Sequence, residues 1–313
     1  MAGVDAYQAQ FAAAGAHLPG AGLPWLRALR ASAFEQFAAA GFPHPKIENW
    51  KYTSLTPLAR LPFAAPGANS PILLPASSLP ASAEAHRVAI VDGRFRADLS
   101  AIGALPAGVI LTGLGQAIAS FPDLVQERLG AAPDFAGQPM LALNTALMAD
   151  GLFLHVPRDT LLQTPIELFC LFSGAGSPAF HPRHLIVMEA GARATVVEQH
   201  AGGAGAYFAN IAADIILEPG AHLRHGKFQA EGGEAWHIAL SRVRIGRGAT
   251  YEICSLATGG QLARNEIRAR LEGAGAVCLL NGAYLARGRQ HLDHTTQIDH
   301  ASPEGRSRQT YHG

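Results

Sequence analysis

Hydrophobic and polar residues follow a recurring unit of about 28 residues between positions 184 and 290. In each of four copies a His or Asn opens an apolar strand, a Gly-Ala pair makes a turn, and a second apolar strand follows. The copies open at His184, Asn210, His237 and Asn265. The turn glycines lie 29, 28 and 27 residues apart, at Gly191, Gly220, Gly248 and Gly275. A period of this length built from strands is typical of a solenoid, in which each coil buries its inner face against its neighbours. The pattern predicts a β-helix with the four turns stacked at equivalent corners.

The rest of the chain divides into a helical region and an arm that precede the solenoid. Residues 1–60 are predicted to be helical, because Pro24 suits a first helical turn, an apolar stripe follows it, and Gly41 supplies a stop. Residues 61–87 carry Pro and small residues too often for regular structure, which indicates a connecting arm. Residues 88–313 form the predicted β-helix core. The expected fold class is therefore mainly β, with an N-terminal helical region.

Two further expectations concern the first part of the core. The segment between Gly113 and Gly130 is predicted to be helical, and short strands are expected to dominate from Leu141 to the end.

Composition and charge exclude several classes of protein. Of the 313 residues, 49 % are apolar, which is enough for a continuous core. Equal numbers of basic and acidic residues, 24 of each, give no net charge, so nucleic acid is not an expected partner. The N-terminus lacks the basic segment of a signal peptide, and no apolar run reaches the roughly 18 residues of a membrane span. The expected compartment is the cytoplasm, with no membrane partner.

Motifs of catalysis are missing from the sequence. It contains no GxxxxGK[ST] phosphate loop, no HExxH and no GxSxG, and the GLGQAI segment after Thr112 lacks the third glycine of GxGxxG. We therefore expect no enzyme activity and assign no catalytic residue.

Three cysteines scattered over the chain predict no disulfide framework. Cys170 and Cys278 lie in apolar runs and are interpreted as buried structural thiols, because a free cysteine packs as a small hydrophobic residue. Cys254 alternates with Glu252 on one face of a predicted strand, so its burial stays open, although a structural role is favoured.

The segment 290–300, QHLDHTTQIDH, is the one polar cluster that could bind a metal ion. In an extended strand His291, Asp293, Thr295, Gln297 and Asp299 share one face, and the residues between them share the other. Imidazole and carboxylate two residues apart can chelate a transition metal, but a polar outer face of a coil is the favoured interpretation. His222 and His225 could also be ligands and are interpreted as surface groups beside a turn. We assign no metal-binding or cofactor-binding residue.

Several segments resemble a known family. Pro43–Leu55, PHPKIENWKYTSL, contains a WKYT motif. Four later segments follow the order of the same family's core, namely 143–169, 181–200, 258–276 and 282–307. The chain thus resembles the SufB/SufD family of the Suf iron–sulfur cluster assembly system over nearly its whole length. It is more similar to the SufD branch, because TVVEQH is followed by a glycine loop and YFAN, where SufB-like chains tend to carry a Cys-containing EGC segment.

The resemblance implies a β-helix flanked by helical domains, pairing with SufB through the two β-helices, and docking of the ATPase SufC. The implied function is that of a non-enzymatic subunit in the assembly of nascent iron–sulfur clusters, with iron supply as the role usually suggested for SufD. Iron or a cluster is expected only in the complex. Trp50 and Tyr52 of the WKYT motif are expected to anchor the helical region or its arm on another surface.

Members of this family continue beyond the region that ends here at Gly313, so the chain is expected to be C-terminally truncated. The SufC-docking helices and a CSHGAT-like segment belong to that continuation, so no active residue is assigned by resemblance. The chain by itself is expected to have no ATPase activity, to fail to recruit SufC, and to self-associate through an uncapped coil. Two alternatives stay open. One is a SufB-like paralogue, and the other is a β-helix polysaccharide lyase, which a solenoid alone would permit.

Overall fold

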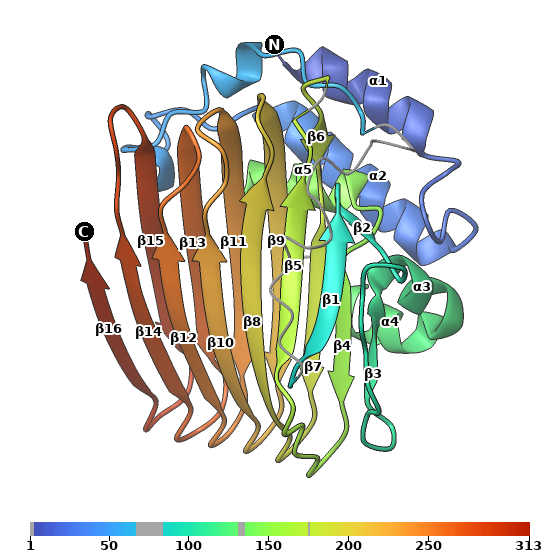
Figure 1. Ribbon diagram of the computed structural model, residues 1–313, viewed down its shortest axis with the longest axis vertical. Coiled ribbons are helices and arrows are strands. Elements are labelled where there is room, and N and C mark those ends of the chain that lie inside the picture. Colours follow the sequence, from blue (N-terminus) through green and yellow to red (C-terminus); the bar gives the residue numbers. More distant parts are fainter. Residues whose placement is uncertain (1–2, 67–83, 131–134, 175) are drawn as a thin grey trace.

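Each coil of the chain contributes one strand to each of two facing sheets, and helices cover the outer side of one sheet (Figure 1). The computed structural model describes residues 3–66, 84–130, 135–174 and 176–313. The first sheet consists, in spatial order, of β2 (Arg94–Phe95), β1 (His86–Val91), β5 (Ile166–Phe172), β8 (Arg193–Gly202), β10 (His222–Gln229), β12 (Thr250–Ala257), β14 (Val277–Tyr284) and β16 (Arg306–His312).

The second sheet consists of β3 (Ile110–Gly113), β4 (Leu152–Val156), β7 (Arg183–Met188), β9 (Tyr207–Leu217), β11 (Ala235–Ile245), β13 (Leu262–Leu271) and β15 (His291–His300), with β6 (Ala179–Phe180) paired to β9. The pairs β1–β2 and β3–β4 are antiparallel, and the strand pairs of the later coils are parallel. The predicted β-helix is therefore confirmed.

The Gly-Ala turns stack at one edge of the solenoid, as their spacing predicts. The amide of Gly191 donates to the carbonyl of Pro219 over 2.9 Å, and the amide of Gly220 donates to that of Arg247 over the same distance. Gly248 and Gly275 make the equivalent bond to the next turn. All four glycines have φ between 62° and 73°, the left-handed region that favours glycine.

The residues that open the four sequence copies are not equivalent in space. His237 is paired with Ala209 and Ala263, whereas Asn210 is paired with Ile238. As a result His237 points into the solenoid, and Asn210 points out towards the helices. The copies vary in length between opening residue and turn, and a shift of one residue in a strand reverses the face of a side chain.

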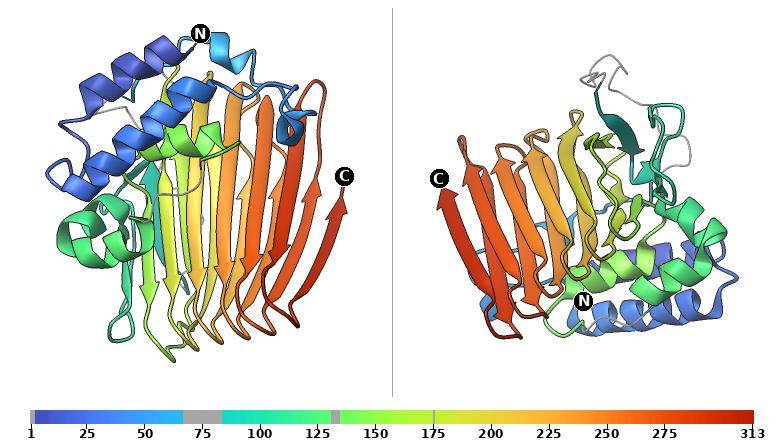
Figure 2. Two further views of the ribbon diagram at one scale, coloured as in Figure 1. Left: turned by 180° about the vertical axis from the view of Figure 1, so that it is seen from behind. Right: turned by 90° about the horizontal axis from the view of Figure 1, so that it is seen from below.

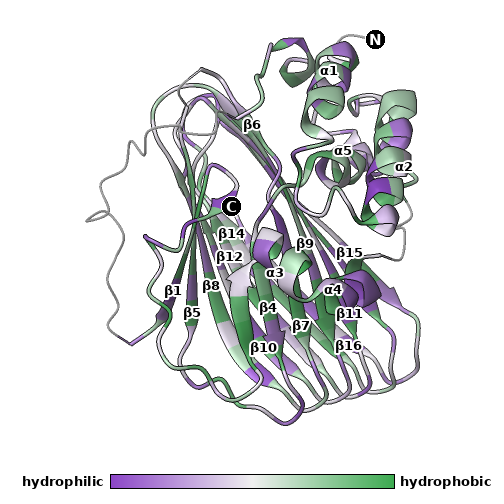
Figure 3. Cartoon of the chain, turned by 90° about the vertical axis from the view of Figure 1, so that its right-hand side faces the viewer, coloured by the Kyte–Doolittle hydropathy of each residue, from purple (hydrophilic) through white to green (hydrophobic). Residues whose placement is uncertain are grey.

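Two apolar cores lie on the two sides of the second sheet. The inner one fills the solenoid with residues such as Val196, Ile253 and Leu280. The outer one joins β4, β7 and β9 to α1 (Val4–Ala14), α2 (Pro24–Ala40), α3 (Leu114–Ser120), α4 (Pro122–Leu129) and α5 (Pro139–Leu147). Figures 2 and 3 show these helices gathered on one side and at one end of the β-helix. Strands buried on both faces read as continuous apolar runs.

The helix α5 differs from the expectation that strands dominate from Leu141. Every residue of α5 is buried, and a short helix that is buried on every side cannot be told from a buried strand by periodicity. The segment between Gly113 and Gly130 is helical as predicted, in the two helices α3 and α4. Residues 67–83 of the predicted arm lie outside the described residues, so the predicted division into domains stays a prediction.

A buried ion pair connects α5 to the solenoid. The fully buried Arg183 of β7 donates from Nε to Asp214 over 2.8 Å, and its Nη1 donates to the Oδ1 of Asn144 in α5 over 3.1 Å. The Nδ2 of Asn144 in turn donates to the carbonyl groups of Pro182 and Asn210. Burying an arginine is favourable only when its donors are satisfied, so this network fixes the position of α5 on the sheet.

The segment Pro43–Leu55 that contains the WKYT motif, called the WKYT segment below, is held against the outer face of β13 and β15. The guanidinium of Arg264 lies 4.2 Å from the ring centroid of Trp50 and donates to the carbonyl of Asn49 over 2.8 Å. Arg264 also forms an ion pair with Asp293, whose carboxylate accepts a hydrogen bond from Thr53. The segment includes the short helix η1 (Glu48–Trp50), and a second one, η2 (Leu58–Arg60), follows it.

The structure gives different outcomes for Trp50 and Tyr52, the two aromatic residues of the WKYT motif. Trp50 is 3 % exposed and packs in the outer core, in agreement with the prediction that it is an anchor. Tyr52 is 81 % exposed, and apart from Lys51 Nζ at 5.4 Å from its ring centroid, no ring or hydrogen-bond contact holds it among the described residues. In addition, no helix among the described residues is long and apolar enough to span a membrane.

Alanine should destabilise the chain more at a left-handed turn glycine than at a glycine in an ordinary conformation. At Gly248, φ is 62° and an added Cβ would meet open space, so Gly248→Ala should cost about 1–2 kcal/mol through the left-handed backbone alone. Gly248→Asn should cost less, because Asn tolerates this conformation. Gly233→Ala is the matched control, because Gly233 also has open space but no left-handed φ. Urea denaturation measures all three, and equal stabilities for Gly248→Ala and Gly233→Ala would contradict the assignment.

The contact between Trp50 and Arg264 predicts that Trp50→Ala destabilises the chain by roughly 3–5 kcal/mol, the usual cost of removing a buried Trp. Tyr52→Ala should change the stability little, because its ring is exposed. Urea denaturation together with limited proteolysis of the first 60 residues distinguishes the two variants. A Trp50→Ala variant as stable as the parent chain would rule out the anchoring role.

Candidate functional site

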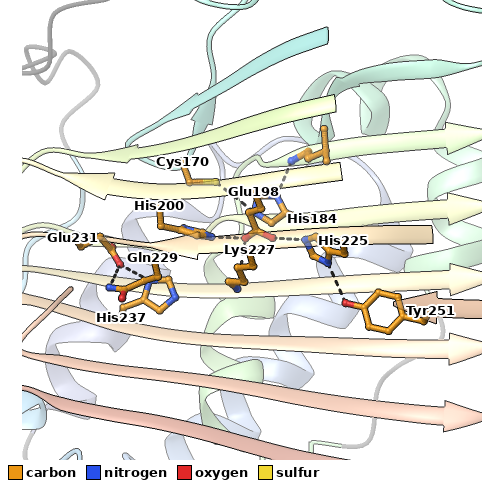
Figure 4. Close-up of polar contacts among 11 residues, drawn as sticks. Cys170, His184, Glu198, His200, His225, Lys227, Gln229, Glu231, His237 and Tyr251 are labelled. Carbon is orange, nitrogen blue, oxygen red and sulfur yellow. Dashed lines mark hydrogen bonds and ion pairs between the residues drawn. The ribbon is translucent and has the colours of Figure 1, made fainter. Parts of the chain in front are cut away.

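Polar and ionisable side chains gather inside the solenoid, where an apolar filling is expected (Figure 4). They come from β5, β7, β8, β10, β11, β12 and the loop after β10, and each is 6 % exposed or less. We call them the interior cluster, which consists of Cys170, His184, Glu198, His200, His225, Lys227, Gln229, Glu231, His237 and Tyr251. Buried polar groups are unfavourable unless they are hydrogen-bonded, so the contacts within this cluster decide whether it is tolerated.

The register of the parallel strands brings these residues together. Cys170 is paired with His200, and His200 with Gln229, while Glu198 is paired with Lys227. Residues two apart on a strand share a face. The interior cluster is thus a patch on the inner face of β5, β8 and β10, and His184 and His237 approach it from the opposite sheet.

Glu198 is the centre of the interior cluster. Its carboxylate forms close contacts with His200 Nε2, lies 3.0 Å from His225 Nε2 and lies 3.6 Å from Lys227 Nζ. Burial alone would raise the pKa of Glu198, but the charge of Lys227 and the hydrogen bonds of the two histidines outweigh it and hold this pKa well below its usual value. Glu198 is therefore ionised.

Cys170 and His184 form a second contact within the interior cluster. The amide of Leu152 donates to His184 Nδ1 over 2.9 Å, and His184 Nε2 lies 3.8 Å from Cys170 Sγ. Burial lowers the pKa of His184 to about 4, so the ring is neutral and carries its proton on Nε2, directed at the sulfur. Burial, together with the negative charge of Glu198, raises the pKa of the Cys170 thiol.

A second carboxylate, Glu231, is bound at the other side of the interior cluster. Its Oε2 lies 2.7 Å from His237 Nδ1 and accepts a hydrogen bond from Gln229 Nε2 over 2.8 Å. Burial would raise the pKa of Glu231, but His237 and Gln229 hold it at about 2. Among the residues that the structure describes, Lys227 is the one lysine or arginine in ion-pair contact with either buried carboxylate.

The three cysteines have different environments. Cys170 and Cys278 are buried, as predicted, although Cys170 belongs to a polar cluster rather than to a purely apolar core. Cys254 is exposed, which contradicts the favoured structural role. Its strand β12 alternates burial, and Cys254 falls on the outward phase together with Glu252.

The interpretation of His225 as a surface group is wrong. It is 4 % exposed and lies between Glu198 and Tyr251, with Nδ1 3.0 Å from the tyrosine hydroxyl. His222 is half-buried at the start of the same strand. The two residues are three apart on β10 and therefore point to opposite faces.

The segment 290–300 behaves as a two-faced strand, as its alternation predicts. On one face His291 and Asp293 contact Thr53 of the WKYT segment. His294, on the other face, lies between the rings of Tyr284 and Tyr311. The outer face thus binds another part of the chain, which favours the structural interpretation over a metal site.

The sequence analysis did not identify Glu198, His200, Lys227 or Glu231 as site residues. The alternation of β8 and β10 does contain an indication of the site. In both strands, polar residues occur at positions that share a face with the buried apolar residues Val196 and Leu223. That signal becomes specific only when the register between coils is known.

Comparison with known proteins agrees with this architecture. A family model described as the SufBD protein N-terminal region matches residues 1–168. A second model, described as the SufBD core domain of SUF system FeS cluster assembly, matches residues 171–313. Together they cover the helical layer and the β-helix.

Individual relatives are distant in sequence. An iron–sulfur cluster assembly SufBD family protein of Synechocystis is 26 % identical over 90 % of this chain and 64 % of its own length. The iron–sulfur cluster assembly protein SufD of Escherichia coli is 26 % identical over 88 % of this chain and 63 % of its own length. The chloroplastic protein ABCI7 of Arabidopsis thaliana is 26 % identical over 94 % of this chain and 62 % of its own length.

The chain therefore spans less than two thirds of the length of these relatives. The two family models nevertheless cover nearly all of it, in the order in which the helical layer and the solenoid occur. On these grounds the chain belongs to the SufBD family of iron–sulfur cluster assembly proteins.

Proposed function

We propose that this chain acts as a SufD-like subunit that assembles nascent iron–sulfur clusters together with SufB and the ATPase SufC. The observation that carries the proposal is the continuous match of both SufBD family models to one folded unit. The chain is a structural partner in this proposal rather than an enzyme, and SufC supplies the ATP hydrolysis. The compartment in which we propose that the protein functions is the cytoplasm.

The SufD-like assignment is supported by the segment that follows TVVEQH. A glycine loop and YFAN stand there, where SufB-like chains tend to carry a Cys-containing EGC segment. The E. coli relative of comparable identity carries the name SufD. A SufB-like role is the alternative, and the lack of an EGC segment at this place counts against it.

The polysaccharide lyase alternative loses its support. Its basis was the solenoid alone, and the family models now account for the solenoid.

The proposal predicts the partners that the protein captures in its own cell. An affinity tag placed at the N-terminus of the chromosomal gene product should recover SufB and SufC in fixed proportion, identified by mass spectrometry. A SufB bait should recover the tagged protein reciprocally. Tyr52→Ala provides a variant with an altered exposed residue and an intact fold, which tests whether this aromatic side chain belongs to the interface.

The identity of the recovered partner decides between the two branches. A family member with the EGC segment indicates a SufD-like role for this chain, and a member without it indicates a SufB-like role. Recovery of neither SufB nor SufC under conditions that preserve the complex in a reference strain would contradict the proposed function.

A further inference from the structure

We propose that the interior cluster binds one divalent transition-metal ion through the thiolate of Cys170, the carboxylate of Glu198 and the imidazole of His200. One ligand atom of each residue lies within 4.8 Å of the other two. Bonds from such an ion to sulfur, nitrogen and oxygen are about 2.0–2.3 Å long, so an ion bound here replaces the direct contact between His200 Nε2 and the Glu198 carboxylate. The inference concerns the chain by itself and does not depend on the proposed function.

The three ligands stand on two neighbouring strands of the first sheet. Cys170 and His200 are register partners on β5 and β8, and Glu198 is two residues from His200 on the same face. All three are 3 % exposed or less. A site built on neighbouring strands holds its geometry better than one on loops.

The groups around the ligands are those that a metal site requires. The Nε2 proton of His184 is directed at Cys170 Sγ, so this ring is placed to donate to a metal-bound thiolate. His225 and Lys227 bind the carboxylate of Glu198 and orient it. Such outer partners fix the orientation of metal ligands in proteins.

The charges of the interior cluster are compatible with a bound cation. Among the described residues, the carboxylates of Glu198 and Glu231 have one lysine, Lys227, within ion-pair distance, and their other ion-pair partners are histidines. A divalent ion that displaces the Cys170 proton adds one net positive charge beside these two carboxylates.

The chemistry of binding is a proton exchange without redox change. The ion forms a bond to Cys170 Sγ, and the thiol proton leaves to solvent. His200 stays neutral and carries its proton on the ring nitrogen that does not bind the ion. Affinity should therefore rise about tenfold for each pH unit while the thiol is protonated in the free chain.

The ligand set points to the kind of ion. Thiolate and imidazole favour Zn²⁺, Fe²⁺ or Co²⁺ over Mg²⁺ and Ca²⁺, and three protein ligands leave a coordination position for water. A small cavity adjoins the interior cluster on the side of the later coils, lined by polar residues such as Lys227, His237 and Asn265 and by apolar residues such as Leu256 and Ala263.

Cobalt titration tests the site directly. The purified chain, stripped with a chelator and kept anaerobic, should bind one Co²⁺ with a thiolate-to-cobalt charge-transfer band, and Zn²⁺ should displace it. Cys170→Ser should abolish the band, and both it and His200→Gln should weaken binding at least tenfold. His184→Gln should weaken it by about 10–100-fold, as loss of an outer partner does.

Cys278→Ala is the matched control, because Cys278 is also a buried cysteine of the inner core but lies outside the interior cluster. It should keep the band and the affinity. Circular dichroism and urea denaturation check the fold of every variant. If Cys170→Ser does not fold, X-ray absorption of the zinc-loaded parent chain decides, and one sulfur ligand is expected. Absence of the charge-transfer band, a spectrum with nitrogen and oxygen ligands alone, or unchanged affinity in folded Cys170→Ser overturns the proposal.

Discussion

The parallel register between successive coils is the constraint on which the whole structure depends. Each strand satisfies its backbone groups with the strands of the preceding and following coils, as in the continuous pairing of β8, β10 and β12. A coil by itself would leave these groups unpaired and its inner face exposed. The same register decides which side chains stack, so the apolar core and the interior cluster have one origin.

The interior of the solenoid contains an apolar region and a polar region. Aliphatic residues such as Val196 and Ile253 stack in one part, and Glu198, His200 and Lys227 stack in the other. The energetic cost of burying charges is offset only by close pairing, which explains why each buried carboxylate has several partners. Replacing a buried ion pair by apolar residues of similar volume is often neutral or stabilising, so the polar filling is not needed for stability.

The helical layer is tied to the solenoid by interactions of the same kind. Arg183 joins α5 to β9 through Asp214, and Arg264 joins the WKYT segment to β15 through Trp50 and Asp293. In both places an arginine with several donors binds backbone and side-chain groups from distant parts of the chain. These two arginines therefore hold α5 and the WKYT segment on the outer face of the β-helix.

Much of the fold was determined by the sequence itself. The positions of Gly191, Gly220, Gly248 and Gly275 predict the coil length and the stacked turns, because a left-handed corner favours glycine at each repeat. The stop at Gly41 and the helical segments between Gly113 and Gly130 were also predicted correctly. These features depend on local backbone preferences, which a sequence carries directly.

The tertiary structure decided the face of each side chain and the partners of the buried groups. His225, expected on the surface, lies inside, and Cys254, whose burial the sequence left open, lies outside, because the face of a strand residue depends on a register between coils that periodicity alone does not determine. The helix α5 was missed because a segment buried on every side has no amphipathic period. Cys170, Glu198 and His200 meet only through the pairing of β5 with β8, a contact between residues about 30 positions apart.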